Sequence, residues 1–97
     1  MKLIYCPYCG DLVVLRLMDV RFCECRRSWG VYEPDGLQAA VSEGAIPVGF
    51  SNGSFAEALL NQPEAGLGHR FEAFVIPSSC PTVTYYHTLE EWSEKHG

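Results

Sequence analysis

The chain has 97 residues, a length that fits one compact unit or two small modules and excludes two domains of ordinary size. Hydrophobic residues make up 47% and charged residues 20%, a balance that is typical of a folded protein and excludes a disordered one. The formal net charge of −5 disfavours nonspecific nucleic-acid binding, which depends on neutralising phosphates.

The charge is unevenly placed. Residues 1–33 carry five basic and four acidic side chains, whereas residues 34–97 carry two basic and eight acidic ones. No run approaches the roughly 20 apolar residues that a membrane helix needs, and the first residues lack the apolar stretch of a secretory signal. We therefore expect a cytoplasmic protein without membrane contact.

The first third of the chain predicts a small β-structure around two pairs of cysteines. Residues 2–5 predict a strand that leads into Cys6-Pro7-Tyr8-Cys9-Gly10, where proline and glycine favour a tight turn. The apolar segments 12–17 and 20–22, with a turn between them, predict a β-hairpin that places the second pair beside the first. Residues 28–32 predict one further, aromatic strand.

The rest of the chain predicts β-structure with two short helices. After a turn at residues 33–36, the segments 37–42 and 45–50 predict a second hairpin, in which Pro47 requires an edge position or a bulge. Capping-box patterns that begin at Ser54 and Thr88 predict the two helices. The expected helices cover residues 55–61 and 89–95, and further strands are expected at 70–76 and 82–86.

Four of the five cysteines form two close pairs, Cys6 with Cys9 and Cys23 with Cys25. Thiolates at such spacing are typical of a tetrahedral Cys₄ zinc site, although C-x-C is shorter than the usual C-x₂-C. We predict one structural Zn²⁺; iron on the same ligands stays an alternative. Disulfides are disfavoured because five thiols leave one over, and because Cys23 and Cys25 lie too close in sequence to bridge easily.

These patterns together predict an α+β fold in two parts. Residues 1–33 are expected to form a small N-terminal β zinc ribbon, because a structural metal can fix a lobe that is too small for its own core. Residues 34–97 are expected to form a small mixed β-sheet lobe with two short helices, on which the ribbon packs.

The motif Cys6-Pro7-Tyr8-Cys9-Gly10 resembles the first knuckle of zinc-ribbon proteins, and this resemblance covers about the first third of the chain. Residues 45–50, Ser54-Phe55 and residues 66–77 also resemble small uncharacterised bacterial or phage proteins with an N-terminal zinc ribbon. That group implies no activity.

Cys-Pro-Tyr-Cys is also similar to a glutaredoxin active site, which would make the protein a thiol-disulfide oxidoreductase. The dithiol of that family opens a helix, which lowers the pKa of its first thiol. Here Gly10-Asp11 leads instead into a β-branched run, and a second thiol pair follows. The oxidoreductase is therefore the minor alternative.

A site with four protein ligands leaves no open position for activated water, so we expect a binding protein and not an enzyme. The candidates for contact with a partner combine cationic and aromatic side chains, which are favoured at interfaces: Arg26, Arg27, Trp29 and Tyr32. The alternative is that Trp29 packs against the ribbon and both arginines are only solvated. We favour a protein partner.

Two further alternatives concern other side chains. A nucleic-acid-associated ribbon would place Arg16 and Arg21 on one face with Arg26 and Arg27. Cys80 could form a nucleophilic pair with His69 or His87, but a buried free thiol is the expected state of this residue.

Overall fold

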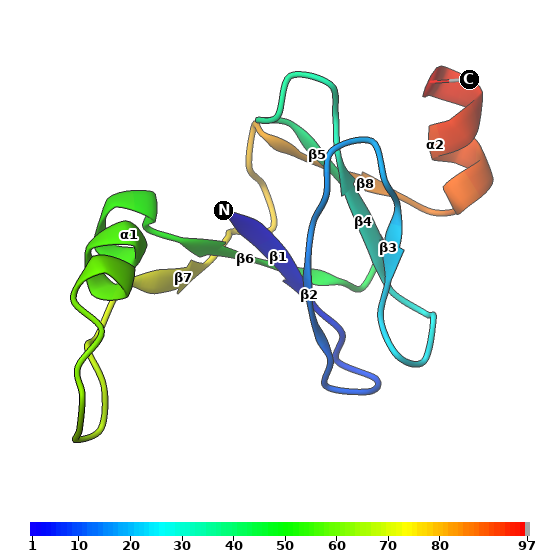
Figure 1. Ribbon diagram of the computed structural model, residues 1–97. Helices are drawn as coiled ribbons and strands as arrows, with labels where there is room; N and C mark the ends of the chain where they lie inside the picture. Colours follow the sequence, from blue (N-terminus) through cyan, green and yellow to red (C-terminus); the bar gives the residue numbers. More distant parts are fainter. Residues whose placement is uncertain (97) are drawn as a thin grey trace.

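The computed structural model describes residues 1–96 of the chain, and within this part it has eight strands and two helices in two four-stranded sheets (Figure 1). The predicted α+β class is confirmed. The elements are β1 Lys2–Tyr5, β2 Leu12–Val14, β3 Arg21–Phe22, β4 Trp29–Tyr32, β5 Ala39–Ser42, β6 Ile46–Phe50, α1 Asn52–Leu60, β7 Ala73–Val75, β8 Val83–Tyr86 and α2 Leu89–His96.

The two sheets differ in their strand directions. The first sheet has the order β2-β1-β6-β7 and is antiparallel throughout. The second sheet has the order β3-β4-β5-β8, and its last pair is parallel, with Ala39 opposite Val83. Each sheet combines strands from residues 1–33 with strands from residues 34–97, so the two predicted units share both sheets. The boundary at residue 33 itself stays a prediction.

Neither predicted hairpin forms. Strand β2 pairs with β1, whereas β3 pairs with β4, and only a bridge between Arg16 and Asp19 connects the two segments at their turn. Strands β5 and β6 likewise lie in different sheets, although the turn between them forms with Ala45 N–H donating to the Ser42 carbonyl. A local pattern specifies a turn, but it does not specify whether the flanking strands pair or lie in separate packed sheets.

Pro47 lies in an inner strand and pairs with Ile4 in an uninterrupted register, so the predicted edge position or bulge is wrong. Its carbonyl accepts a hydrogen bond from Ile76 N–H, just beyond the end of β7. The nitrogen and oxygen of one strand residue point to the same side of the strand. The Pro47 nitrogen, which carries no hydrogen, therefore faces the β7 side and not β1. The pairing with β1 therefore loses no hydrogen bond.

Apolar side chains fill both faces of the second sheet. One cluster joins it to the first sheet and includes Ile4, Leu15 and Val41. A second cluster covers the opposite face and includes Trp29, Val31 and Trp92, the last of which comes from α2. The second sheet is thus buried on both faces, by the first sheet and by helix α2.

An arm, formed by α1, residues 61–72 and β7, extends from the first sheet (Figure 1). Its base holds three phenylalanine rings, Phe50, Phe55 and Phe71, with centroids 4.8 to 5.1 Å apart. Only Ala58 is buried in helix α1. The molecule is accordingly elongated, with extents of 48 × 29 × 23 Å.

The two capping-box predictions have different outcomes. Helix α1 begins at Asn52, and Ser54 does not cap it, because its hydroxyl donates to the Ser51 carbonyl and accepts from Glu72 N–H. Thr88 does cap α2, since its oxygen accepts the N–H of Glu91 at 3.2 Å. The Ser54 hydroxyl instead connects the first turn of α1 to Glu72, the residue that precedes β7.

Candidate metal centre

Four cysteine sulfurs converge where two loops meet, at the end of β1 and between β3 and β4. The sulfurs of Cys6, Cys9, Cys23 and Cys25 all lie within 4.8 Å of one another. Cys25 Sγ lies 3.7 Å from Cys6 Sγ and 3.6 Å from Cys23 Sγ. Tetrahedral bonds of about 2.3 Å to a zinc ion place ligand sulfurs about 3.8 Å apart, so the four side chains fit one metal ion.

The first loop is held by backbone hydrogen bonds around Cys6. Gly10 N–H donates to the Cys6 carbonyl at 2.8 Å, and Cys6 N–H donates to the Asp11 carbonyl at 2.9 Å. Gly10 has a φ of 76°, in the left-handed region that glycine enters without steric cost. The turn predicted from Pro7 and Gly10 therefore brings both thiols of the first pair to one side.

The second loop closes in the same way around Cys23. Cys23 N–H donates to the Ser28 carbonyl at 3.0 Å, and Arg26 N–H donates to the Cys23 carbonyl at 3.0 Å. Arg26 has a φ of 65° and occupies the position after the second cysteine, as Gly10 does in the first loop. For a residue with a Cβ, this left-handed conformation costs about 1 to 2 kcal/mol.

Asp11 connects the two loops. Its carboxylate, half-buried after the first pair, accepts the backbone N–H of Glu24 at 2.9 Å, between the cysteines of the second pair. The sequence offered no signal for this contact, because Asp11 lies thirteen residues from Glu24 and its role depends on the fold. The contact fixes the distance between the two thiol pairs from outside the sulfur cluster.

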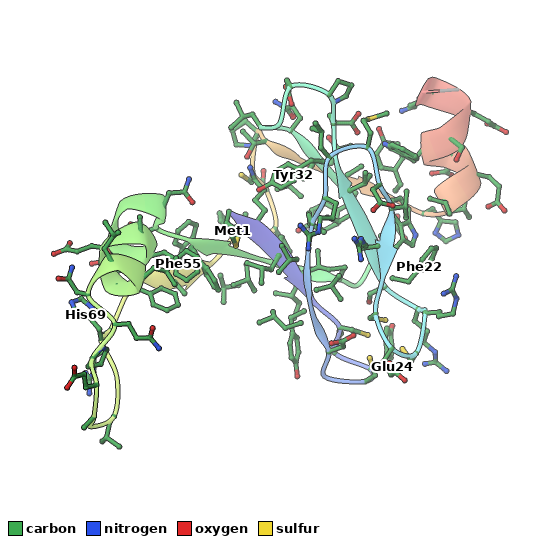
Figure 2. All side chains as sticks on the ribbon, in the orientation of Figure 1. Met1, Phe22, Glu24, Tyr32, Phe55 and His69 are labelled. Atoms are coloured by element: carbon green, nitrogen blue, oxygen red, sulfur yellow. The ribbon has the colours of Figure 1, made fainter. Side chains whose placement is uncertain are left out.

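The four thiols are unequally exposed. Cys6 and Cys23 are buried, with 0% and 3% of their surfaces exposed, whereas Cys9 and Cys25 are exposed. Figure 2 shows the sulfur atoms near Glu24, at the end of the two sheets. The site therefore has an inner pair within the core and an outer pair on the surface.

Polar neighbours lower the pKa of both inner thiols despite their burial. Burial raises the pKa of Cys6, but the nearby Ser28 hydroxyl, the N–H groups of Cys9 and Tyr8 and the Cys23 thiol outweigh it and lower this pKa to about 6. Burial also raises the pKa of Cys23, and contacts that include Ser28 N–H outweigh it and lower the value below 9.0.

Cys25 behaves in the opposite way. The N–H of Arg27 lowers the pKa of Cys25, but burial and the hydrogen bonds with the other three cysteines outweigh this effect and raise the pKa to about 12. A cation bound among the four sulfurs would favour their thiolate forms, because a metal ion binds thiolates and not thiols.

The four predicted partner residues do not share one exposed surface. Trp29 is 5% exposed and packs in the cluster beneath α2. Tyr32 is half-buried, and its hydroxyl oxygen accepts Lys2 N–H at 2.7 Å. Arg26 and Arg27 are exposed and directly follow Cys25 in the chain. The guanidinium of Arg26 lies 4.2 Å from the ring centre of Phe22, and that of Arg27 lies 4.9 Å from the ring centre of Tyr8.

Cys80 stands apart from the cluster. It is half-buried, and its sulfur lies 3.4 Å from the hydroxyl oxygen of Thr82. Hydrogen bonds with the side chain and backbone of Thr82 lower the pKa of Cys80. Among the interactions of the described residues, His69 contacts the Arg70 carbonyl and His87 contacts Glu43, so neither histidine is paired with this thiol.

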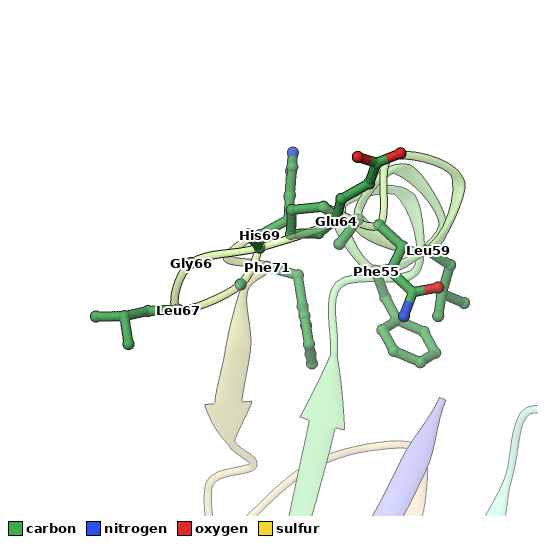
Figure 3. Close-up of a pocket in the computed structure, with 12 residues that line it drawn as sticks. Phe55, Leu59, Glu64, Gly66, Leu67, His69 and Phe71 are labelled. Carbon is green, nitrogen blue, oxygen red and sulfur yellow. The ribbon is translucent and has the colours of Figure 1, made fainter.

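A separate hollow of about 460 Å³ lies on the arm, between α1 and the loop that follows it (Figure 3). Phe55, Leu59 and Phe71 contribute apolar surface, and His69 and Glu64 are the titratable residues of its lining. Its residues come from the arm alone, whereas the four clustered cysteines follow β1 and β3. The hollow is therefore not part of the metal centre.

Comparisons with protein-family models, with curated proteins and with solved structures gave no match for this chain. The resemblance to zinc-ribbon proteins therefore rests on the cysteine motif alone, and the structure adds that the four sulfurs of this motif lie close enough together to hold a metal ion. No helix in the described part of the chain is long and apolar enough to cross a membrane.

Proposed function

We propose that the protein binds one structural Zn²⁺ through Cys6, Cys9, Cys23 and Cys25 and acts by contact with another protein. The convergence of four thiol sulfurs within 4.8 Å is the observation that carries this proposal. Four thiolates form a complete tetrahedral set for zinc, and such closed sites stabilise folds instead of activating water. A reducing compartment such as the cytoplasm would keep these thiols free to bind the ion.

The first test is the metal content of protein purified without chelator. We expect one zinc per chain by elemental analysis, and we expect Cys23→Ser to lose most of it. Cys80→Ser is the matched control and should retain the ion, because this thiol lies outside the cluster. Absence of stoichiometric metal would end the proposal, whereas stoichiometric iron with its visible absorption would replace zinc by the alternative ion.

Arg26 and Arg27 carry the proposal for the partner surface. Each stacks on an aromatic ring, and neither takes part in an ion pair among the described side chains. A stacked guanidinium keeps its N–H edges available for carboxylates. The rest of the chain is acidic. These two exposed arginines therefore favour a partner whose own acidic groups contact the end of this protein that holds the four cysteines.

The second test compares the proteins captured by wild type and by the double variant Arg26→Ala, Arg27→Ala. We expect the double variant to keep its zinc and fold but lose most of the partner, because neither side chain binds metal. Arg70→Ala, on the arm, is the control for loss of an exposed arginine. Equal capture by all three proteins would place the interface elsewhere.

The same protein samples test the two alternatives. Salt-sensitive retention of DNA or RNA would favour the nucleic-acid-associated ribbon. This retention should disappear when four arginines are replaced together by alanine: Arg16, Arg21, Arg26 and Arg27. Glutathione-dependent disulfide reduction by the metal-free chain would favour the oxidoreductase.

A further inference from the structure

The Ser28 hydroxyl is an exception among the buried polar groups. Ser28 is 1% exposed, and its Oγ is the one buried side-chain oxygen or nitrogen without a hydrogen-bond partner among the described residues. The other buried serine, Ser42, has its partner, since its Oγ accepts Trp29 N–H at 3.0 Å. A buried hydroxyl without a hydrogen-bond partner destabilises a fold, so the presence of one at Ser28 requires an explanation.

The backbone of Ser28 fixes its side chain against the inner thiols. Ser28 N–H donates to Cys23 Sγ at 3.3 Å, and the Ser28 carbonyl accepts Cys23 N–H at 3.0 Å. The Ser28 side chain also neighbours Cys6, but its hydroxyl forms no hydrogen bond with that sulfur. The unpaired donor therefore lies beside Cys6, the least exposed of the four candidate ligands.

We propose that the Ser28 hydroxyl donates a hydrogen bond to Cys6 Sγ when this sulfur binds the metal, which makes Ser28 a positioning residue of the metal centre. A metal-bound thiolate is a charged acceptor and forms stronger hydrogen bonds than a thiol. Four thiolates around a divalent ion carry a net charge of −2, and the buried Cys6 sulfur has no access to water. This inference rests on the proposed function, because it requires a bound ion.

The experiment compares Ser28→Ala with Ser42→Ala, which removes the hydroxyl of the other buried serine. We expect Ser28→Ala to weaken Zn²⁺ binding about 10- to 100-fold in competition with a chelator. In the Co²⁺-loaded protein it should also shift the sulfur-to-cobalt charge-transfer bands. Ser42→Ala should lower fold stability without moving the bands, and Ser28→Thr, which keeps a hydroxyl, should restore affinity and bands toward wild type.

A measurement on the wild-type chain covers the case in which Ser28→Ala does not fold. In protein loaded with ¹¹³Cd²⁺, the Ser28 hydroxyl proton should exchange slowly and show a coupling to the cadmium nucleus through the hydrogen bond. Unchanged affinity and bands in Ser28→Ala, or no such proton in the cadmium protein, would overturn the role of Ser28. Failure of the wild-type chain to bind any of the three ions would instead overturn the proposed function.

Discussion

Gly30 sets how closely the two sheets approach within the core. A Cβ at this position would lie 2.6 Å from Leu15 Cδ2 and 3.4 Å from Ile4 Cγ2. Its neighbours in β4, Trp29 and Val31, belong to the cluster on the opposite face of the sheet. The first sheet can therefore place two large aliphatic side chains directly against the backbone of β4.

We expect Gly30→Ala to lower the free energy of unfolding by about 1 to 3 kcal/mol, because Leu15 must leave its position. Gly53→Ala is the matched control: no atom lies within 4 Å of its added Cβ, and Gly53 is in the exposed first turn of α1. There the same substitution should be neutral or stabilise by up to about 1 kcal/mol. Denaturant unfolding of both variants measures the difference, and equal stabilities would contradict the close packing at β4.

Helix α2 is held to the second sheet by one large side chain and by contacts at its start. Trp92 is 7% exposed, and its indole N–H donates to Glu33 Oε1 at 2.8 Å. Just before the helix, His87 Nδ1 lies 2.9 Å from Glu43 Oε2, and both side chains are exposed. The hydrogen bond and charge of Glu43, with the charge of Glu91, raise the pKa of His87 above 6.5.

The raised pKa predicts a pH-dependent contribution of this pair. Protonated His87 gains more from Glu43 in the folded state, so the contribution is complete below pH 6.5 and disappears as the pH rises through the folded pKa. We expect wild type to exceed Glu43→Gln slightly in urea midpoint near pH 5.5, and to match it near pH 9, since exposed ion pairs are weak. A difference that is constant with pH would exclude the pair as its source.

The sequence predicted individual strands and helices better than it predicted which strands pair with one another. The strand at residues 2–5 and the cap at Thr88 were correct because they depend on neighbouring residues. The cysteine spacing likewise predicted the sulfur cluster. Strand pairing was missed because β5 pairs with β8 at the other end of the chain, and neither Asp11 nor Ser28 belongs to a motif. Their contacts arise only when two distant loops meet.

The cysteine cluster lies where the two sheets of the molecule meet. Cys6 follows β1, an inner strand of the first sheet, whereas Ser28 and the second cysteine pair precede β4, an inner strand of the second sheet. Both strands pair with segments beyond residue 33. A bound ion would therefore connect the two sheets through β1 and β4.

We expect chelation of the ion to reduce hydrogen-exchange protection in β5 and β6 as well as in β1 and β4. Structural zinc contributes about 10 to 16 kcal/mol of apparent stability in small peptides, so the effect should be large. Amides of α1 serve as the internal control and should exchange early in both states, because this helix buries only Ala58. Loss of protection confined to residues 1–33 would show that the ion stabilises a separate unit.

The spacing of the four sulfurs also affects the order of assembly. The ligand set is complete at Cys25, and the short segment between the two thiol pairs costs little entropy to close. The second sheet, in contrast, is completed only by β8 at Val83–Tyr86, because its parallel partner β5 lies far earlier in the chain. As synthesis proceeds from the N-terminus, both knuckles leave the ribosome well before the last strand. A nascent chain could thus capture its ion first and build the two sheets onto a crosslink that already exists.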